Sequence, residues 1–178
     1  MEYQIPNHDF ILGLSHCIKN AKQLLTLAYE TFKNDCFQAA YLLGFASLEE
    51  IGKAIVILNH IEEEYISKEV YFKEFRNHNH KITLALNMSD DNLLEVHHGV
   101  SRDEFPILEY DDERKKMLLD IRTRSIYLDY DFEKICWRVP LSKMDELAHT
   151  IIRTADMALS HFDNELKYRE IKLINHSF

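Results

Sequence analysis

The sequence predicts an all-α protein, an up-and-down helical bundle that begins with a long helical hairpin. Composition is the first reason: 178 residues with only 4 Gly and 3 Pro lack the turn residues that β-sandwiches and barrels need. The second is that a chain of this length with 46% hydrophobic residues can bury one substantial core. The third is periodicity, because apolar residues recur every three or four positions along several long stretches. We therefore expect a single helical domain over residues 1–178.

An apolar stripe predicts the first helix over residues 8–33. Its members share one helical face: Leu14, Ile18, Ala21, Leu25, Ala28 and Phe32. Asn34 and Asp35 break the pattern and are expected to cap a second helix. That helix is predicted over residues 37–65 and is apolar on nearly every side, which places it in the middle of the bundle.

Shorter elements are expected in the rest of the chain. Ser67 is expected to cap a segment that reaches Phe75, and another helix should cover residues 80–88. Residues 89–112 are acidic and irregular in pattern, as in a functional or mobile loop. A helix is predicted over residues 112–128, and residues 130–139 fit either a helix or an extended segment. Pro140 suits the first turn of a last helix that ends near residue 170.

Charge and cysteine usage restrict the class of protein. A net charge of −9 argues against non-specific coating of nucleic acid, although it leaves room for a small basic site. Cys17, Cys36 and Cys136 are far apart and form no Cys-x-x-Cys pair, which argues against a disulfide framework or structural zinc. The first residues show no basic-then-apolar signal pattern, and no uncharged apolar run approaches about 18 residues. We therefore expect a cytoplasmic protein with no membrane or DNA partner.

Three charged residues interrupt the most apolar helix: Glu49, Glu50 and Lys53. Because neither carboxylate has an evident solvent-facing side, these charges must be paired or must line a site. Glu49 and Lys53 have the favourable i,i+4 spacing, and Gly52 permits a close approach of another helix. Two interpretations stay open, an internal ion pair that fixes helix register and a functional polar site.

A basic cluster, Arg76 to Lys81, follows the short segment and includes His78 and His80. It is either a solvated turn or a phosphate or RNA site, in which a histidine transfers protons and the cations stabilise developing charge. Arg122 is a further candidate because it shares a helical stripe with Leu119 and Ile126.

Metal binding is a rival interpretation. Glu95 with His98, and Glu146 with His149, form two Glu-x-x-His pairs of the kind that di-iron bundles use. The first pair lies in the irregular acidic segment, and chance pairs are expected in a chain with 10 His. We therefore expect no metal ion and no cofactor.

Three stretches, in this order, resemble the AbiV abortive-infection proteins of bacteria. Residues 48–54, Leu-Glu-Glu-Ile-Gly-Lys-Ala, resemble a helix of that family. Phe75, His78 and Lys81 resemble its Phe-x-x-His-x-x-Lys segment, and residues 122–140 resemble its third block. The resemblance implies antiviral defence, in which the phage programme is arrested at the level of translation or RNA, and a phage-encoded protein partner.

The third block is also similar to the Arg-x(4–6)-His motif of HEPN ribonucleases, which are helical bundles that cut RNA without metal, commonly as dimers. Arg122 matches the arginine, whereas Tyr127 stands where the histidine would be and Asp129 where a later tyrosine would be. Tyrosine, with a pKa of about 10, is a poor base near pH 7. His78 or His80 would then have to move the proton.

On an unbroken helix Arg122 and Tyr127 stand about 140° apart, so they meet only if the helix ends near Ile126 or a second subunit completes the site. The resemblance implies Arg122, His78 and Tyr127 as catalytic residues of a homodimer. It implies that the substrate-binding or polar residues are Glu49, Glu50, Lys53, His80, Lys81 and Asp129. The alternatives are a non-catalytic, protein-binding helical switch and, less favoured, the metal-binding bundle.

Overall fold

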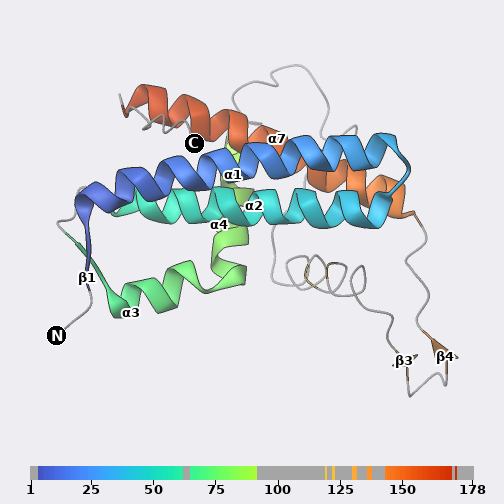
Figure 1. Ribbon diagram of the computed structural model, residues 1–178, viewed down its shortest axis with the longest axis horizontal. Helices are drawn as coiled ribbons and strands as arrows, with labels where there is room; N and C mark the ends of the chain where they lie inside the picture. Colours follow the sequence, from blue (N-terminus) through green and yellow to red (C-terminus); the bar gives the residue numbers. More distant parts are fainter. Residues whose placement is uncertain are drawn as a thin grey trace.

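The computed structural model describes residues 4–61, 65–91, 119, 122, 130–131, 136–137, 143–169 and 171. Helices α1 (Asn7–Lys33) and α2 (Phe37–Asn59) form an antiparallel hairpin, and α7 (Met144–Tyr168) packs against both. Helix α4 (His78–Asp91) crosses behind α2 and also contacts α7 (Figure 1). The predicted all-α bundle with a long N-terminal hairpin is therefore confirmed.

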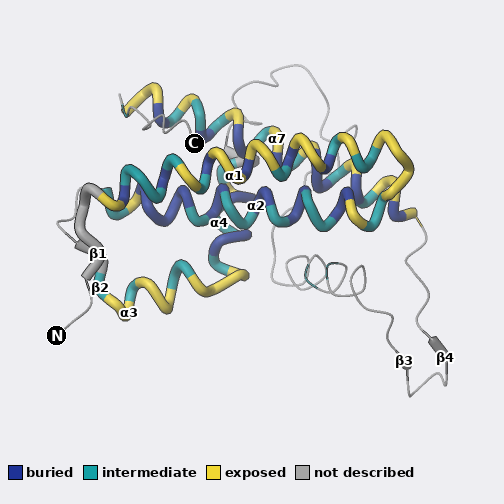
Figure 2. Tube along the Cα trace, in the orientation of Figure 1, coloured by how far each residue is buried: buried dark blue, intermediate teal, exposed yellow. Residues whose placement is uncertain are grey.

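Helix α2 lies at the centre of the bundle, as its all-round apolar pattern predicts. It contacts each of the other long helices that the structure describes, and it is buried along most of its length, whereas α1 and α7 expose one face (Figure 2). The largest fully buried side chains are Tyr41, Phe45, Phe162, Leu14, Ile18, Leu48, Ile51, Ile82, Leu86, Ile151 and Ile152. Each buried side chain of this size contributes about 1.5–3 kcal/mol of transfer free energy.

The turn of the hairpin differs from its expected chemistry. Asp35 has a left-handed backbone, with φ of 58°, and the amide of Asn34 donates to the carbonyl of Glu30 at 2.8 Å. The N-cap of α2 is Cys36, with no side-chain cap hydrogen bond. The expectation that Asn34 or Asp35 caps α2 is therefore wrong, because both are used to close the end of α1.

Helix α2 also ends earlier than predicted, at Asn59 instead of residue 65. Strand β2 (Tyr65–Ser67) follows and pairs antiparallel with β1 (Gln4–Pro6), a long-range pairing that has no local sequence pattern. The expected capping by Ser67 is confirmed, because its Oγ accepts a hydrogen bond from the amide of Val70 at 3.2 Å. Ser67 starts the short helix α3 (Lys68–Val70), which passes into a π-helical turn, η1 (Tyr71–Phe75).

The starts of two further helices, α4 and α7, differ from the prediction. Helix α4 starts at His78, two residues before the prediction, and Asn77 accepts the amide of His80 at 3.1 Å. It also includes residues 89–91 of the expected loop, whereas residues 92–112 lie outside the described residues. Helix α7 starts at Met144 after a left-handed Lys143, with φ of 67°, so the prediction that the helix begins around Pro140 is wrong.

The segment before α7 is extended where the structure describes it. Strand β3 (Tyr130–Asp131) pairs antiparallel with β4 (Cys136–Trp137), in agreement with the extended alternative for residues 130–139. The helix predicted over residues 112–128 lies outside the described residues, apart from Leu119 and Arg122. Among the helices that are described, none is long and apolar enough to cross a membrane.

Candidate polar site between helices α2 and α4

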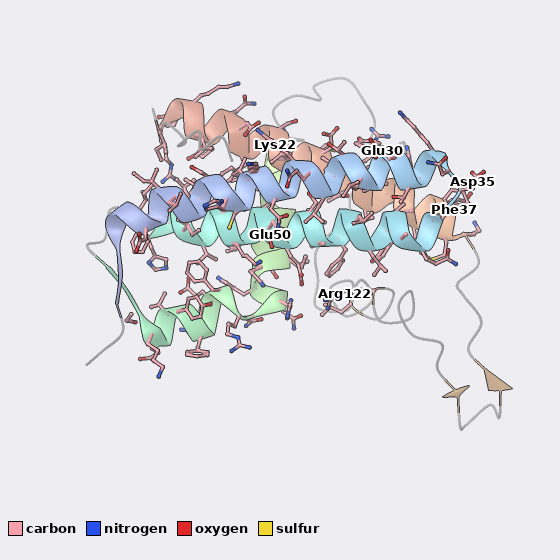
Figure 3. All side chains as sticks on the ribbon, viewed as in Figure 1. Lys22, Glu30, Asp35, Phe37, Glu50 and Arg122 are labelled. Carbon is pink, nitrogen blue, oxygen red and sulfur yellow. The ribbon has the colours of Figure 1, made fainter. Side chains whose placement is uncertain are left out.

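The charged residues of α2 form two contacts on the same stretch of the helix. Lys53 forms an ion pair with Glu50, one turn before it, through Nζ and Oε1. Glu49 instead contacts His78, the first residue of α4, through Oε1 and Nδ1. The i,i+4 pair expected between Glu49 and Lys53 is therefore replaced by these two contacts, because α4 brings a histidine to Glu49. Figure 3 shows Glu50 on the ribbon of α2.

Gly52 allows α4 to approach α2 closely, as the sequence predicts. A Cβ atom at position 52 would lie only 2.1 Å from the carbonyl oxygen of Lys81. The two backbones therefore touch, and Lys81 is 3% exposed. This contact explains how a lysine becomes buried beside the charged residues of α2.

The surroundings of the cluster shift the pKa values of Lys81 and Lys53 in opposite directions. Burial lowers the pKa of Lys81, and the positive charges of Lys53 and Arg122 lower it further against the opposing effect of Glu49 and Glu50. Burial also acts to lower the pKa of Lys53, but the hydrogen bond and charge of Glu50 outweigh it, so that pKa is raised. The two lysines therefore have pKa values that are shifted in opposite directions, although they belong to the same cluster.

Cys17 of α1 completes the buried side of this cluster. Burial, together with the charge and hydrogen bond of Glu50, raises the pKa of the Cys17 thiol to about 12. Sequence reasoning missed Cys17 as a neighbour of the site. Its position three residues after Leu14 and four before Ala21 could have placed it on the buried face of α1.

His78 is held by a carboxylate and remains accessible to solvent. Its side chain is 52% exposed, whereas that of Glu49 is only 13% exposed. A carboxylate can only accept a hydrogen bond, so we assign the proton to Nδ1 of His78. This leaves Nε2 as the ring nitrogen that can accept a proton.

His80 belongs to a different set of contacts. Its Nε2 lies 3.9 Å from Oε2 of Glu74, and His60 approaches the same oxygen at 3.1 Å. The structure thus separates the two histidines of the basic cluster: His78 faces Glu49, and His80 faces the η1 turn. Glu74 and His60 were not identified from sequence, because they come together only through the packing of η1 against α2.

Arg122 lies beside α2 (Figure 3). Its guanidinium carbon is 5.5 Å from the centroid of the buried Phe45 ring, a cation–π distance. Arg122 also lies close enough to Lys81 to lower its pKa. Tyr127 and Asp129, the other candidates from the third block, lie outside the described residues.

The described residues include no group of three His, Cys, Asp or Glu side chains that could hold a metal ion. In the second Glu-x-x-His pair, Glu146 binds Lys143 at 3.3 Å, and the ring centroid of His149 lies 5.8 Å from that of Phe32. Glu95 and His98 lie outside the described residues.

The chain is an all-helical bundle whose central helix carries a charged cluster facing a histidine of α4. The family model for HEPN-type AbiV proteins, described as AbiV, matches residues 11–160. The chain therefore belongs to the AbiV family. No curated protein and no solved structure matches it.

Proposed function

We propose that this protein acts in anti-phage abortive infection by cutting RNA without a metal ion at the cluster of Glu49, His78 and Arg122. Membership of the AbiV family supports the defence role. The observation that carries the chemistry is the contact between the partly buried Glu49 and the exposed His78. It orients the imidazole and fixes its tautomer, as a carboxylate does in other acid–base sites.

In the proposed reaction, Nε2 of His78 takes the proton from a ribose 2′-hydroxyl. The 2′ oxygen attacks the adjacent phosphorus while the bond from phosphorus to the 5′ oxygen breaks. The products are a 2′,3′-cyclic phosphate and a 5′-hydroxyl, and the proton taken by His78 returns to the leaving 5′ oxygen through water. Such positioned proton transfer is typically worth 10²–10⁴-fold in rate.

The surrounding charges support binding of a phosphate. Three cations, Lys53, Lys81 and Arg122, lie near two carboxylates, Glu49 and Glu50. When all five are charged, the cluster therefore carries a net positive charge within a chain of net charge −9. Arg122 is the side chain to which we assign stabilisation of the charge that develops on the phosphate oxygens.

The test is incubation of the purified protein with total cellular RNA and tRNA in EDTA. We expect fragments with 2′,3′-cyclic phosphate ends from the wild type, and none from His78→Ala or Arg122→Ala at unchanged melting temperature. Added imidazole should restore part of the activity of His78→Ala. His149→Ala is the matched control, because it removes an exposed histidine far along the chain, on α7. Absence of cleavage in all samples, with a phage lysate added as a source of activator, would contradict the proposal.

The burial of Lys81 favours a second candidate function, a non-catalytic switch that binds a phage-encoded or host protein. In that case the polar cluster would set the register of α2 and α4, and a partner would act by changing it. His78→Ala would then lower the melting temperature and abolish defence together, with no RNA cleavage by the wild type. We also propose that the protein is a cytoplasmic homodimer, which light scattering of the purified protein tests.

A further inference from the structure

The segment of α3 and η1 carries an exposed aromatic surface. Tyr71 is 39% and Phe72 49% exposed, which is unusual for large aromatic side chains. The Tyr71 ring stacks on Phe75, with centroids 5.4 Å apart, and meets Phe72 edge-on at 5.6 Å. We call these three rings, of Tyr71, Phe72 and Phe75, the aromatic platform.

Two cations flank the platform. The ammonium of Lys68 lies 6.0 Å and the guanidinium of Arg76 5.6 Å from the centroid of Phe72. Glu74, on the same segment, is turned toward His60 and bound to it, while Glu69 remains an exposed acid on α3. The outer surface around Phe72 therefore combines a solvent-exposed aromatic ring with two positive charges.

The platform lies next to the candidate site along the chain. Arg76 is separated from His78 by a single residue, Asn77, which caps α4. The rings are carried by a π-helical turn, a conformation that is rare and is frequently found at functional sites. Arg76, beside the platform, and His78, in the candidate site, are only two positions apart in the chain.

We infer that the aromatic platform binds unpaired bases of single-stranded RNA and directs the strand to His78. Exposed rings that stack bases, next to cations that hold phosphates, are how proteins bind single strands without sequence preference. The positive charge around Phe72 in an otherwise acidic chain favours a polyanion over a second copy of this protein. The choice of RNA as the ligand rests on the proposed function. The stacking of bases on the exposed rings is independent of that function.

The test is fluorescence anisotropy with a fluorescein-labelled single-stranded 2′-O-methyl RNA, which has no free 2′-hydroxyl and so cannot be cut. We expect Phe72→Ala to weaken binding about 5- to 150-fold, the range for loss of one stacked base. Phe72→Trp should retain binding, and its added indole fluorescence should be quenched by RNA. Leu27→Ala is the matched control, because Leu27 is 48% exposed but lies on α1. A duplex of the same sequence should bind more weakly, since its bases are paired.

Unchanged binding in Phe72→Ala, or equal binding of duplex and single strand, would overturn the inference. If Phe72→Ala leaves RNA binding intact but converts a dimer to a monomer in light scattering, the platform is a contact between copies and the inference is also overturned. Phe72-dependent binding without cleavage by any sample would refute the ribonuclease mechanism while leaving the platform as a single-strand site.

Discussion

Gly52 and Lys81 are in backbone contact across the interface of α2 and α4. A Cβ atom at position 52 would lie 2.1 Å from the carbonyl oxygen, 2.5 Å from the carbonyl carbon and 2.8 Å from the Cα of Lys81. Since backbone atoms cannot rotate away as a side chain can, any other residue at 52 must push the helices apart. This contact therefore sets the distance at which Glu49 meets His78.

The first prediction is that Gly52→Ala destabilises the fold despite the better helix propensity of alanine. Overpacking typically costs about 1–3 kcal/mol, and in a domain of this size each kcal/mol lowers the melting temperature by about 2–4 °C. Gly13→Ala is the matched control, because its Cβ would meet only the end of the Ile57 side chain, at 3.4 Å. That variant should gain up to about 1 kcal/mol from helix propensity. Calorimetry measures both, and equal stability of the two variants would contradict the prediction.

The polar residues of α2 could be identified from sequence, because charges on a helix that is apolar all round must be paired or line a site. Their partners could not be predicted. The i,i+4 spacing of Glu49 and Lys53 predicts an ion pair between them. Glu49 instead contacts His78, 29 residues away, and Lys53 forms its ion pair with Glu50. Local spacing competes here with a tertiary contact that only the packing of α2 on α4 creates.

Helix interiors were predicted better than helix ends for a related reason. The stripe of α1 continues to Lys33 as expected, because burial of a whole face decides it. The end of α2 and the start of α7 depend on single residues instead. Lys143 has a left-handed backbone, a conformation that glycine or asparagine usually signals in a sequence, and position 143 is neither. The pairing of β1 with β2 joins distant segments and has no local pattern.

The second prediction concerns pH, because burial lowers the pKa of Lys81. Between that lowered value and the ordinary pKa of 10.5, the unfolded chain binds more protons than the folded protein, so the free energy of unfolding rises with pH. Relative to Lys81→Met, the wild type should therefore gain stability as the pH rises toward 10.5. Urea titrations from pH 7 to 10.5 measure this difference. Lys33→Met, at an exposed position, is the control. If the difference in stability between the wild type and Lys81→Met does not change with pH, the lowered pKa of Lys81 is contradicted.

The third prediction is that the two described cysteines of the helical hairpin differ in reactivity. Burial and Glu50 raise the pKa of Cys17 to about 12, and the thiolate is the reactive form. Cys36 is exposed. Iodoacetamide at pH 8 should therefore alkylate Cys36 in the native protein and Cys17 only after unfolding, as mass spectrometry of peptides will show. Similar rates at both residues would mean that the polar cluster opens readily. Glu50→Gln should speed alkylation of Cys17, since it removes the negative charge that opposes the thiolate.

The last prediction separates positioning from packing at Glu49 and His78. If Glu49 acts on RNA cleavage only by orienting His78, then His78→Gln should lower the cleavage rate by at least about 10²-fold. Glu49→Gln should lower the cleavage rate less, because the amide oxygen of glutamine can still accept a hydrogen bond from the imidazole N–H of His78. The double variant should be no slower than His78→Gln alone, since residues that act as a unit are not additive. The melting temperature should change little in His78→Gln, whose side chain is half exposed. Additive losses of cleavage, or a parallel fall in melting temperature, would instead assign the pair to the packing of α4 on α2.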